Sequence, residues 1–330
     1  MKWKDKKKNT RQRIIKRNFF KRKGDKRRHN YRLLRRVQRV EIIVPKDFSL
    51  LNNTEETLKC LNSLIDNVSR QRSSINVNSS NVIFVDPAAL MYLISILNDA
   101  SRRHIVIRGT YPNDIKTKTL FVKYGFHRFV NHNKRKSYNY IDDDTLQIRE
   151  SKTVSPDIAK SIVEFSGSHN CFNENKSLEK GLYASLIEMM ANACQHAYDC
   201  IKLNRWFISC EYSDGLVSFV LFDKGVGIPS TVQRKMKDKL NSIRNKQESI
   251  ILKSALKGDF RTQTKEVNRG KGLPQIYEFL KSDNVVSAIL LSGYGYCEIT
   301  NDNVKINVDL KNRLHGTLYS WSIKGVDSDA

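Results

Sequence analysis

Three separated segments in the second half of the chain carry residue types suited to binding a phosphorylated ligand. The first runs from Glu188 through Asn192 to His196, so that polar side chains recur every four residues. On a helix this spacing places all three on one face. A solvated polar stripe has the same pattern, so the segment alone is a weak indication of a site.

The second segment is a carboxylate followed by two glycines. Asp223 comes after the β-rich run 216–222 and precedes Gly225 and Gly227. A carboxylate at the end of a strand is a fixed hydrogen-bond acceptor, and glycines leave backbone that a planar ligand approaches closely. A simple turn has the same D-x-G-x-G string, so a structural role stays equally open.

The third segment is glycine-rich and basic and begins a predicted helix at 272–281. Gly270 and Gly272 allow backbone N–H groups to turn toward a phosphate, and Arg269 and Lys271 add positive charge. A single G-x-G string is common. The order and the helix or strand context of all three segments together are much more specific.

In this order the segments resemble the GHKL ATPases, a family that includes DNA gyrase B, heat-shock chaperone ATPases, mismatch-repair ATPases and histidine kinases. The resemblance covers about residues 160–325 and implies a Bergerat α/β sandwich. The segment at Glu188 is similar to the N box, the one at Asp223 to the D-x-G-x-G box, and the third to the lid. Gly316-Thr317 is similar to the closing G-T of the fold.

The resemblance implies ATP and Mg²⁺ as cofactors. Asn192 would hold the Mg²⁺ that bridges the phosphates. Glu188 would face the γ-phosphate and act as the general base for an attacking water. The chain would then be an ATP hydrolase that works as a nucleotide-driven switch.

The same resemblance assigns the adenine pocket and the lid. Asp223 would accept a hydrogen bond from the adenine amino group, with Thr317 nearby through water, and Gly225 and Gly227 would shape the pocket. The lid would extend from about Gly258 and become ordered when ATP binds. Its residues over the triphosphate would be Gly270, Lys271 and Gly272.

Departures from the family leave alternatives open. The third segment continues as Leu273-Pro274 and lacks the second glycine-leucine repeat of kinases, and no helix with a phospho-accepting histidine precedes the domain. A histidine kinase is therefore a poor interpretation. A protein serine kinase of the anti-sigma-factor type and a non-hydrolysing ATP sensor remain alternatives to the ATPase.

Residues 39–131 form a first predicted domain, in which strands and helices alternate. It resembles a STAS-type module, the fold of anti-sigma-factor antagonists. Ala88 and Ala89 follow Asp86-Pro87 where that family has its regulatory serine, so the resemblance implies a docking or allosteric element for a protein partner and no phosphorylation site. Expected elements are strands at 40–45, 82–85 and 104–109 and helices at 53–68, 86–97 and 116–130.

A polar linker is expected at 132–158, and the second domain then spans 159–330. It begins a long helix at 182 and has a hairpin around Asp214-Gly215. The predicted elements of this domain are helices at 182–204 and 272–281 and strands at 206–212, 216–222, 288–300, 304–310 and 317–323.

The N-terminal arm, residues 1–38, differs from the rest of the chain in its high density of positive charge. The whole chain has a formal net charge of +24, and residues 1–40 hold 19 Lys and Arg against two acids, a net +17. Residues 41–330 hold the other 39 and 32, a net +7. A charge run is often a solvated tail, but this density predicts salt-sensitive binding of DNA or RNA. An acidic membrane surface is the alternative partner.

Composition excludes several other classes. The chain has no apolar run long enough to span a membrane and no apolar core of a secretory signal. Six cysteines without a C-x-x-C pair indicate buried thiols of a reducing compartment. We expect a soluble, cytoplasmic protein, and leave a homodimer open. An ATPase with a nucleic-acid-binding arm would suit a DNA-linked regulator or an anti-phage defence component.

Overall fold

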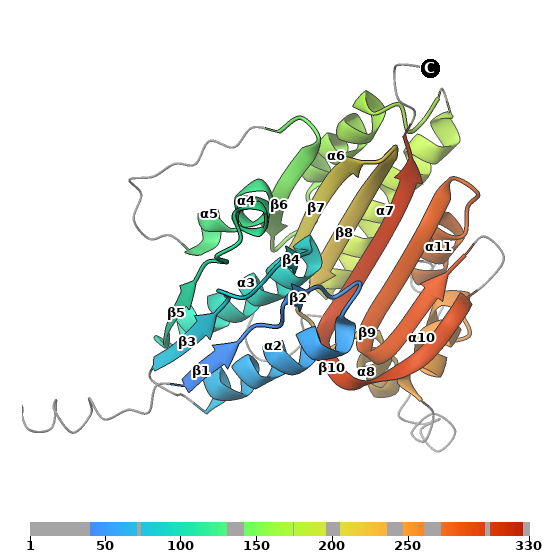
Figure 1. Cartoon of the computed structure of the whole chain (residues 1–330). Helices are drawn as coiled ribbons and strands as arrows, with labels where there is room; N and C mark the ends of the chain where they lie inside the picture. The colour runs from blue at the N-terminus through green and yellow to red at the C-terminus, as the bar shows by residue number, and fades with distance from the viewer. Residues whose placement is uncertain are drawn as a thin grey trace, which may run out of the picture.

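The computed structural model describes residues 40–70, 74–130, 142–173, 175–195, 205–235, 247–260, 272–300 and 304–325. The predicted arm, 1–38, lies outside the described residues, as does most of the predicted lid. The chain is a mixed α/β protein with several sheets (Figure 1). Within the described part, no helix is long and apolar enough to cross a membrane.

The first unit, residues 40–130, contains a three-stranded parallel sheet in the order β1-β3-β5 and a separate parallel pair, β2-β4. Parallel strands need crossover connections, which helices supply here. The strands are β1 (Val40–Ile43), β2 (Asp47–Phe48), β3 (Ser74–Asn78), β4 (Phe84–Val85) and β5 (Val106–Thr110). The helices are α2 (Thr54–Ser69), α3 (Pro87–Arg102), α4 (Ile115–Lys123) and α5 (His127–Val130).

The second unit, residues 142–325, is built on a five-stranded antiparallel sheet in the order β6-β7-β8-β10-β9. Its strands are β6 (Thr145–Ser151), β7 (Trp206–Ser213), β8 (Leu216–Asp223), β9 (Val285–Ile299) and β10 (Val304–Lys324). Its helices are α6 (Pro156–Ser168), α7 (Lys176–Gln195), α8 (Ile228–Lys235), α10 (Glu248–Lys257) and α11 (Gly272–Leu280).

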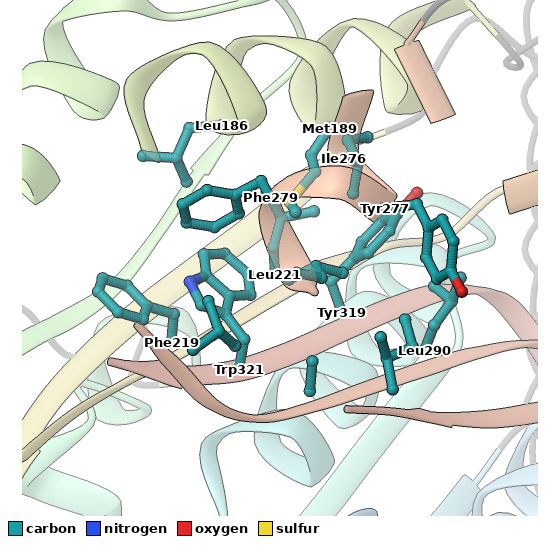
Figure 2. Close-up of a cluster of buried hydrophobic side chains, with 14 of the residues drawn as sticks. Leu186, Met189, Phe219, Leu221, Ile276, Tyr277, Phe279, Leu290, Tyr319 and Trp321 are labelled. Carbon is teal, nitrogen blue, oxygen red and sulfur yellow. The ribbon is translucent and has the colours of Figure 1, made fainter. Parts of the chain in front are cut away.

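Helices α7 and α11 cover one face of this sheet. The cluster in Figure 2 joins Met189 of α7 and Phe279 of α11 to Leu221, Tyr319 and other side chains of the strands below. These residues recur at helical spacing on the helices and at alternate positions on the strands, so each element turns one apolar face to the same core. This packing fixes the opposite, polar side of α7 relative to the sheet.

The first unit covers the other face of the same sheet. Helices α2 and α3 lie between the five-stranded and the three-stranded sheets, so the layers alternate helix, sheet, helix, sheet (Figure 1). One buried cluster contains Tyr92 of α3 together with Phe222 and Leu318 of the second unit, and the rings of Tyr92 and Phe222 lie 5.2 Å apart. The two predicted domains therefore share a core.

Several sequence predictions need correction. The range 132–158 was predicted to be a linker, but residues 145–151 form β6, which pairs with β7. The strands expected at 304–310 and 317–323 belong to one strand, β10, with irregular register between them. The helix predicted at 182–204 begins earlier, at Lys176, and residues 196–204 lie outside the described residues.

The predicted strand at 82–85 is also only partly right. Just two of its residues are in a strand, and β4 pairs with β2, whereas the middle strand of the main sheet is β3. Asp86 caps α3, since its carboxylate accepts from the Ala89 N–H at 2.7 Å and from the Ser49 hydroxyl at 2.6 Å. Ala88 and Ala89 are fully buried. The position compared with the regulatory serine of STAS modules therefore lies inside the fold.

Candidate functional site

Two of the three predicted segments meet where α11 begins. Gly272, the first residue of α11, lies so close to α7 that a Cβ atom built on it would overlap the Glu188 Oε2 oxygen. The Asn192 Nδ2 atom would be 3.8 Å from the same Cβ. Only glycine fits at this position without displacing Glu188. The helix spacing predicted for Glu188 and Asn192 is confirmed, and both face the start of α11.

One atom of the Asn192 amide has no hydrogen-bond partner beside Gly272 among the described residues. This atom, Nδ2, is buried. A buried polar group without a partner is costly, so such groups in native proteins are often completed by a ligand or ion. The oxygen and nitrogen of an amide exchange places by a simple flip, so this end of the side chain offers either an acceptor or a donor.

Asp223 ends β8 and lies opposite Thr317 of β10 in the antiparallel register. The carboxylate is 8% exposed, and burial raises its pKa to about 7, although hydrogen bonds from the Thr317 hydroxyl and the Gly225 N–H act in the opposite direction. A buried carboxylate with two donors on one side is held in a single orientation. The resemblance predicts Thr317 near Asp223 through a water, whereas in the structure the Thr317 hydroxyl bonds directly to the carboxylate.

The loop after Asp223 is held by a residue that the sequence analysis missed. Ser292 of β9 is fully buried; its hydroxyl accepts from the Ile228 N–H at 2.8 Å and lies 3.1 Å from the Thr317 hydroxyl. Gly227 has a φ of +85°, and a Cβ there would lie 3.1 Å from the Ser292 Oγ atom. A serine directly after the apolar run 288–291 was the available signal. Ser292 joins the D-x-G-x-G loop to the G-T pair.

A steric restriction also explains why the first residue of the G-T pair, Gly316, is a glycine. Its φ is +146°, and a Cβ built on it would overlap the backbone carbonyl oxygen of Asp223. A side chain at this position would push β10 away from the end of β8. The glycine therefore brings Thr317 within hydrogen-bonding reach of the Asp223 carboxylate.

Arg313 is a second residue outside the predicted motifs, and no pattern in the sequence points to it. Its guanidinium pairs with the Glu248 carboxylate of α10 at 3.2 Å, and donates to the Ser230 hydroxyl of α8 at 2.7 Å and to the Val226 carbonyl at 3.3 Å. Because Val226 lies between the two loop glycines, Arg313 connects that loop to two helices. Planar guanidinium groups suit such multiple contacts.

The first unit contacts both sides of the Asp223–Thr317 pair. Lys224, next to Asp223, forms an ion pair with Asp99 of α3. On the other strand, the backbone N–H of His315 donates to the Tyr92 hydroxyl at 3.1 Å. Burial lowers the pKa of the Lys224 ammonium, and the charge of Asp99 raises it. Helix α3 therefore forms part of the support behind the predicted site.

The two halves of the site belong to one region. Cys194 lies two residues after Asn192 on α7; burial raises the pKa of its thiol, and the charge of Asp223 adds to that rise. The Cys194 thiol donates to the Lys152 carbonyl at 3.4 Å, and the Trp206 indole N–H donates to the adjacent Thr153 carbonyl at 3.0 Å. Because Trp206 lies opposite Asp223 in the register of β7 and β8, the end of β8 lies near the end of α7. Predicted site residues that lie outside the described residues are His196, Arg269, Gly270 and Lys271.

The chemistry of these side chains suits a ligand with a planar polar end and an anionic end. Asp223 offers an acceptor next to glycine backbone, and Asn192 offers an unpaired amide beside the Glu188 carboxylate and the start of a helix. Among the described residues no group of three or more His, Cys, Asp and Glu side chains could hold a metal. A cation here would need oxygen atoms from the ligand itself. No protein-family model matches the chain, and no curated protein matches it.

Proposed function

We propose that the chain binds ATP in the manner of GHKL proteins, hydrolyses it with Mg²⁺ and acts as a nucleotide-driven switch. The observation that carries the proposal is the convergence at Gly272, where the glycine gives space to Glu188 and to the unpaired amide of Asn192. The Asp223–Thr317 pair lies near the end of α7, the helix that carries Glu188 and Asn192, and supplies the second half of a nucleotide site.

The pair at the strand ends suits adenine. An ionised Asp223 accepts a hydrogen bond from the exocyclic amino group, and the Thr317 hydroxyl holds the carboxylate in place. Guanine has a carbonyl oxygen at the corresponding position, which would face the carboxylate without a hydrogen. The pocket therefore favours ATP over GTP.

The residues at the anionic end fit a magnesium ion. The amide of Asn192 supplies a neutral oxygen ligand of the kind Mg²⁺ accepts together with phosphate oxygens, and the ion would neutralise charge on those phosphates. Glu188 lies beside this point and is the group placed to take a proton from an attacking water. A carboxylate next to a triphosphate is unfavourable unless it has such a use.

Asp223→Asn tests the adenine pocket. The asparagine N–H₂ would face either the adenine amino group or the Gly225 N–H, and one such donor–donor conflict costs about 1–3 kcal/mol. We expect the affinity for a non-hydrolysable ATP analogue to fall about ten- to hundredfold, measured by titration calorimetry. Equal affinity of the wild type for ATP and GTP analogues would contradict the role of Asp223.

The same titration at several pH values measures how far ATP binding depends on the charge of the Asp223 carboxylate. Adenine needs the charged form, and the pKa of Asp223 in the free protein is about 7. Affinity should therefore rise as pH increases through 7 and be about tenfold weaker at pH 6 than at pH 8. Asp223→Asn keeps only the pH dependence of the phosphates and serves as the matched control. Identical pH profiles for the two proteins would remove this assignment.

We also propose that residues 1–38 bind a nucleic acid through their excess of Lys and Arg. Deleting them removes most of the net charge and none of the nucleotide residues. The truncated protein should bind ATP as the wild type does and lose binding to labelled DNA and RNA, whose full-length affinity should fall steeply with salt. Fluorescence anisotropy across a salt series measures both. Nucleic-acid binding that survives the deletion unchanged would refute the role of the arm.

A further inference from the structure

The basic arm enters the folded part at an end of the first unit that itself carries arginines. The strands β1, β3 and β5 are parallel, with Val40 opposite Ile75 and Ser74 opposite Val106, so all three begin at the same end of their sheet. Residue 39, the last of the positively charged N-terminal residues, is bonded to Val40. The arm is therefore attached at this end.

Helices α2 and α3 finish at the same end. Each follows a strand and runs back along the sheet before the next parallel strand begins, as Figure 1 shows for α2 beside the starts of β1 and β3. The two helices run side by side: the Tyr92 hydroxyl lies 3.5 Å from the Asn62 Oδ1 atom. Their last turns therefore lie at the end of the sheet where β1, β3 and β5 begin.

Three arginines lie on these helix ends. Arg70 and Arg103 are exposed, and the side chain of Arg102 is 30% exposed. Arginine next to a helix C-terminus stabilises the helix by about 0.3–1 kcal/mol, which accounts for one such residue at each helix. It does not account for two consecutive arginines at the end of α3, on a surface where a segment of net +17 is attached.

The neighbouring carboxylates form no ion pair with Arg70 or Arg103 in the described part of the chain. Asp99 is in the last turn of α3, but it already pairs with Lys224 and contacts Arg102 at 3.5 Å. Asp66, in the last turn of α2, is the other acid on these two helix ends and is exposed. Arg70 and Arg103 are therefore available to anions from solvent.

We propose that the phosphate backbone of a bound nucleic acid continues from the arm onto this end of the first unit, where Arg70 and Arg103 contact it. The proposal rests on the nucleic-acid part of the proposed function and adds a second contact surface on the folded part of the chain. We call this surface, formed by Arg70 and Arg103, the seat. Exposed guanidinium groups pair with phosphates in a bidentate manner, and contacts of this kind orient a nucleic acid without reading its sequence. Nucleic acid is favoured over a membrane because three arginines lie on these helix ends. Of the exposed apolar side chains in the described part of the first unit, only Val106, at the start of β5, lies at this end.

Arg70→Glu/Arg103→Glu in the full-length protein tests the seat. The matched control is Lys160→Glu/Lys305→Glu, which changes the net charge equally at side chains that are 75% and 64% exposed on the second unit. We expect the arginine variant to bind a labelled duplex of about 20 base pairs at least tenfold more weakly, and the control to change affinity less than threefold. The salt dependence of the arginine variant should be shallower by about two phosphate contacts.

The same series with single-stranded RNA separates the two nucleic acids, and vesicles containing phosphatidylserine test the membrane alternative. ATP-analogue binding and melting temperature report folding, and Arg70→Gln/Arg103→Gln replaces the glutamates if they unfold the protein. Equal losses in arginine variant and control, or none in either, would overturn the seat while leaving the arm's role intact. If the wild type binds vesicles and no nucleic acid, both proposals about nucleic acid fail.

Discussion

Glu188→Ala is expected to keep the affinity for ATP and to reduce turnover at least a hundredfold. A general base accelerates the attack of water about 10²–10⁴-fold and adds little to ground-state binding. The structure supports the separation, because Glu188 lies beside Gly272 at the edge of the helix layer and belongs to neither of the buried hydrophobic clusters. Phosphate release measures turnover, and calorimetry measures affinity.

Glu188→Gln is the closest control for this experiment. It retains the shape and the contact with Gly272 but has no basic oxygen, so it should be as inactive as the alanine variant. Turnover within fivefold of the wild type in both variants would exclude Glu188 as the base. Wild-type protein that binds ATP without turnover would favour the sensor or the kinase, and transfer of a radiolabelled phosphate to a partner protein would establish the kinase.

Asn192→Ala is expected to abolish the Mg²⁺-dependent part of ATP binding. In the wild type, affinity for an ATP analogue should rise when Mg²⁺ is added; in the variant, Mg²⁺ should have no effect, a difference we expect to exceed a hundredfold. The variant should remain folded because the Asn192 Nδ2 atom has no partner among the described residues, so its removal breaks no bond of that atom.

Gln195→Ala on the same helix is the matched amide control, since Gln195 is exposed and lies at the end of α7. It should bind Mg²⁺ and ATP as the wild type does. Unchanged Mg²⁺-dependent affinity in Asn192→Ala would contradict the GHKL proposal altogether, because no other residue of the described part was assigned to the metal.

Elements with strong periodicity were predictable from the sequence. The hairpin of β7 and β8 and helix α11 agree with the predicted ranges to within one residue. The two strands are mainly apolar runs on either side of Asp214-Gly215, and helical spacing is clear in α11. Strand β3 was missed because its sequence, SINVN, contains residues with low strand propensity, and only its pairing on both sides makes it a strand. Strand β6 was missed for the same reason at the sheet edge.

The site was predictable where the spacing of residues within one motif, or the order of known motifs, determines which side chains lie together. Helical spacing placed Glu188 beside Asn192, and the resemblance placed Thr317 beside Asp223. Ser292 and Arg313 could not be predicted in this way, because each reaches the D-x-G-x-G loop only through the tertiary arrangement of distant strands and helices. Contacts of this kind depend on which surfaces meet, and no local pattern records them.

The core shared by the two units bears on how the chain folds while it is synthesised. Residues 42–126 leave the ribosome before the second unit, yet the buried cluster that contains Tyr92 also includes residues of that unit as distant as Phe222, Leu291 and Leu318. Contacts at such sequence separations form late and slowly. The nascent first unit therefore exposes the apolar sides of α2 and α3 until nearly the whole protein has been made, and during that time these two helices are the natural place for a chaperone to bind.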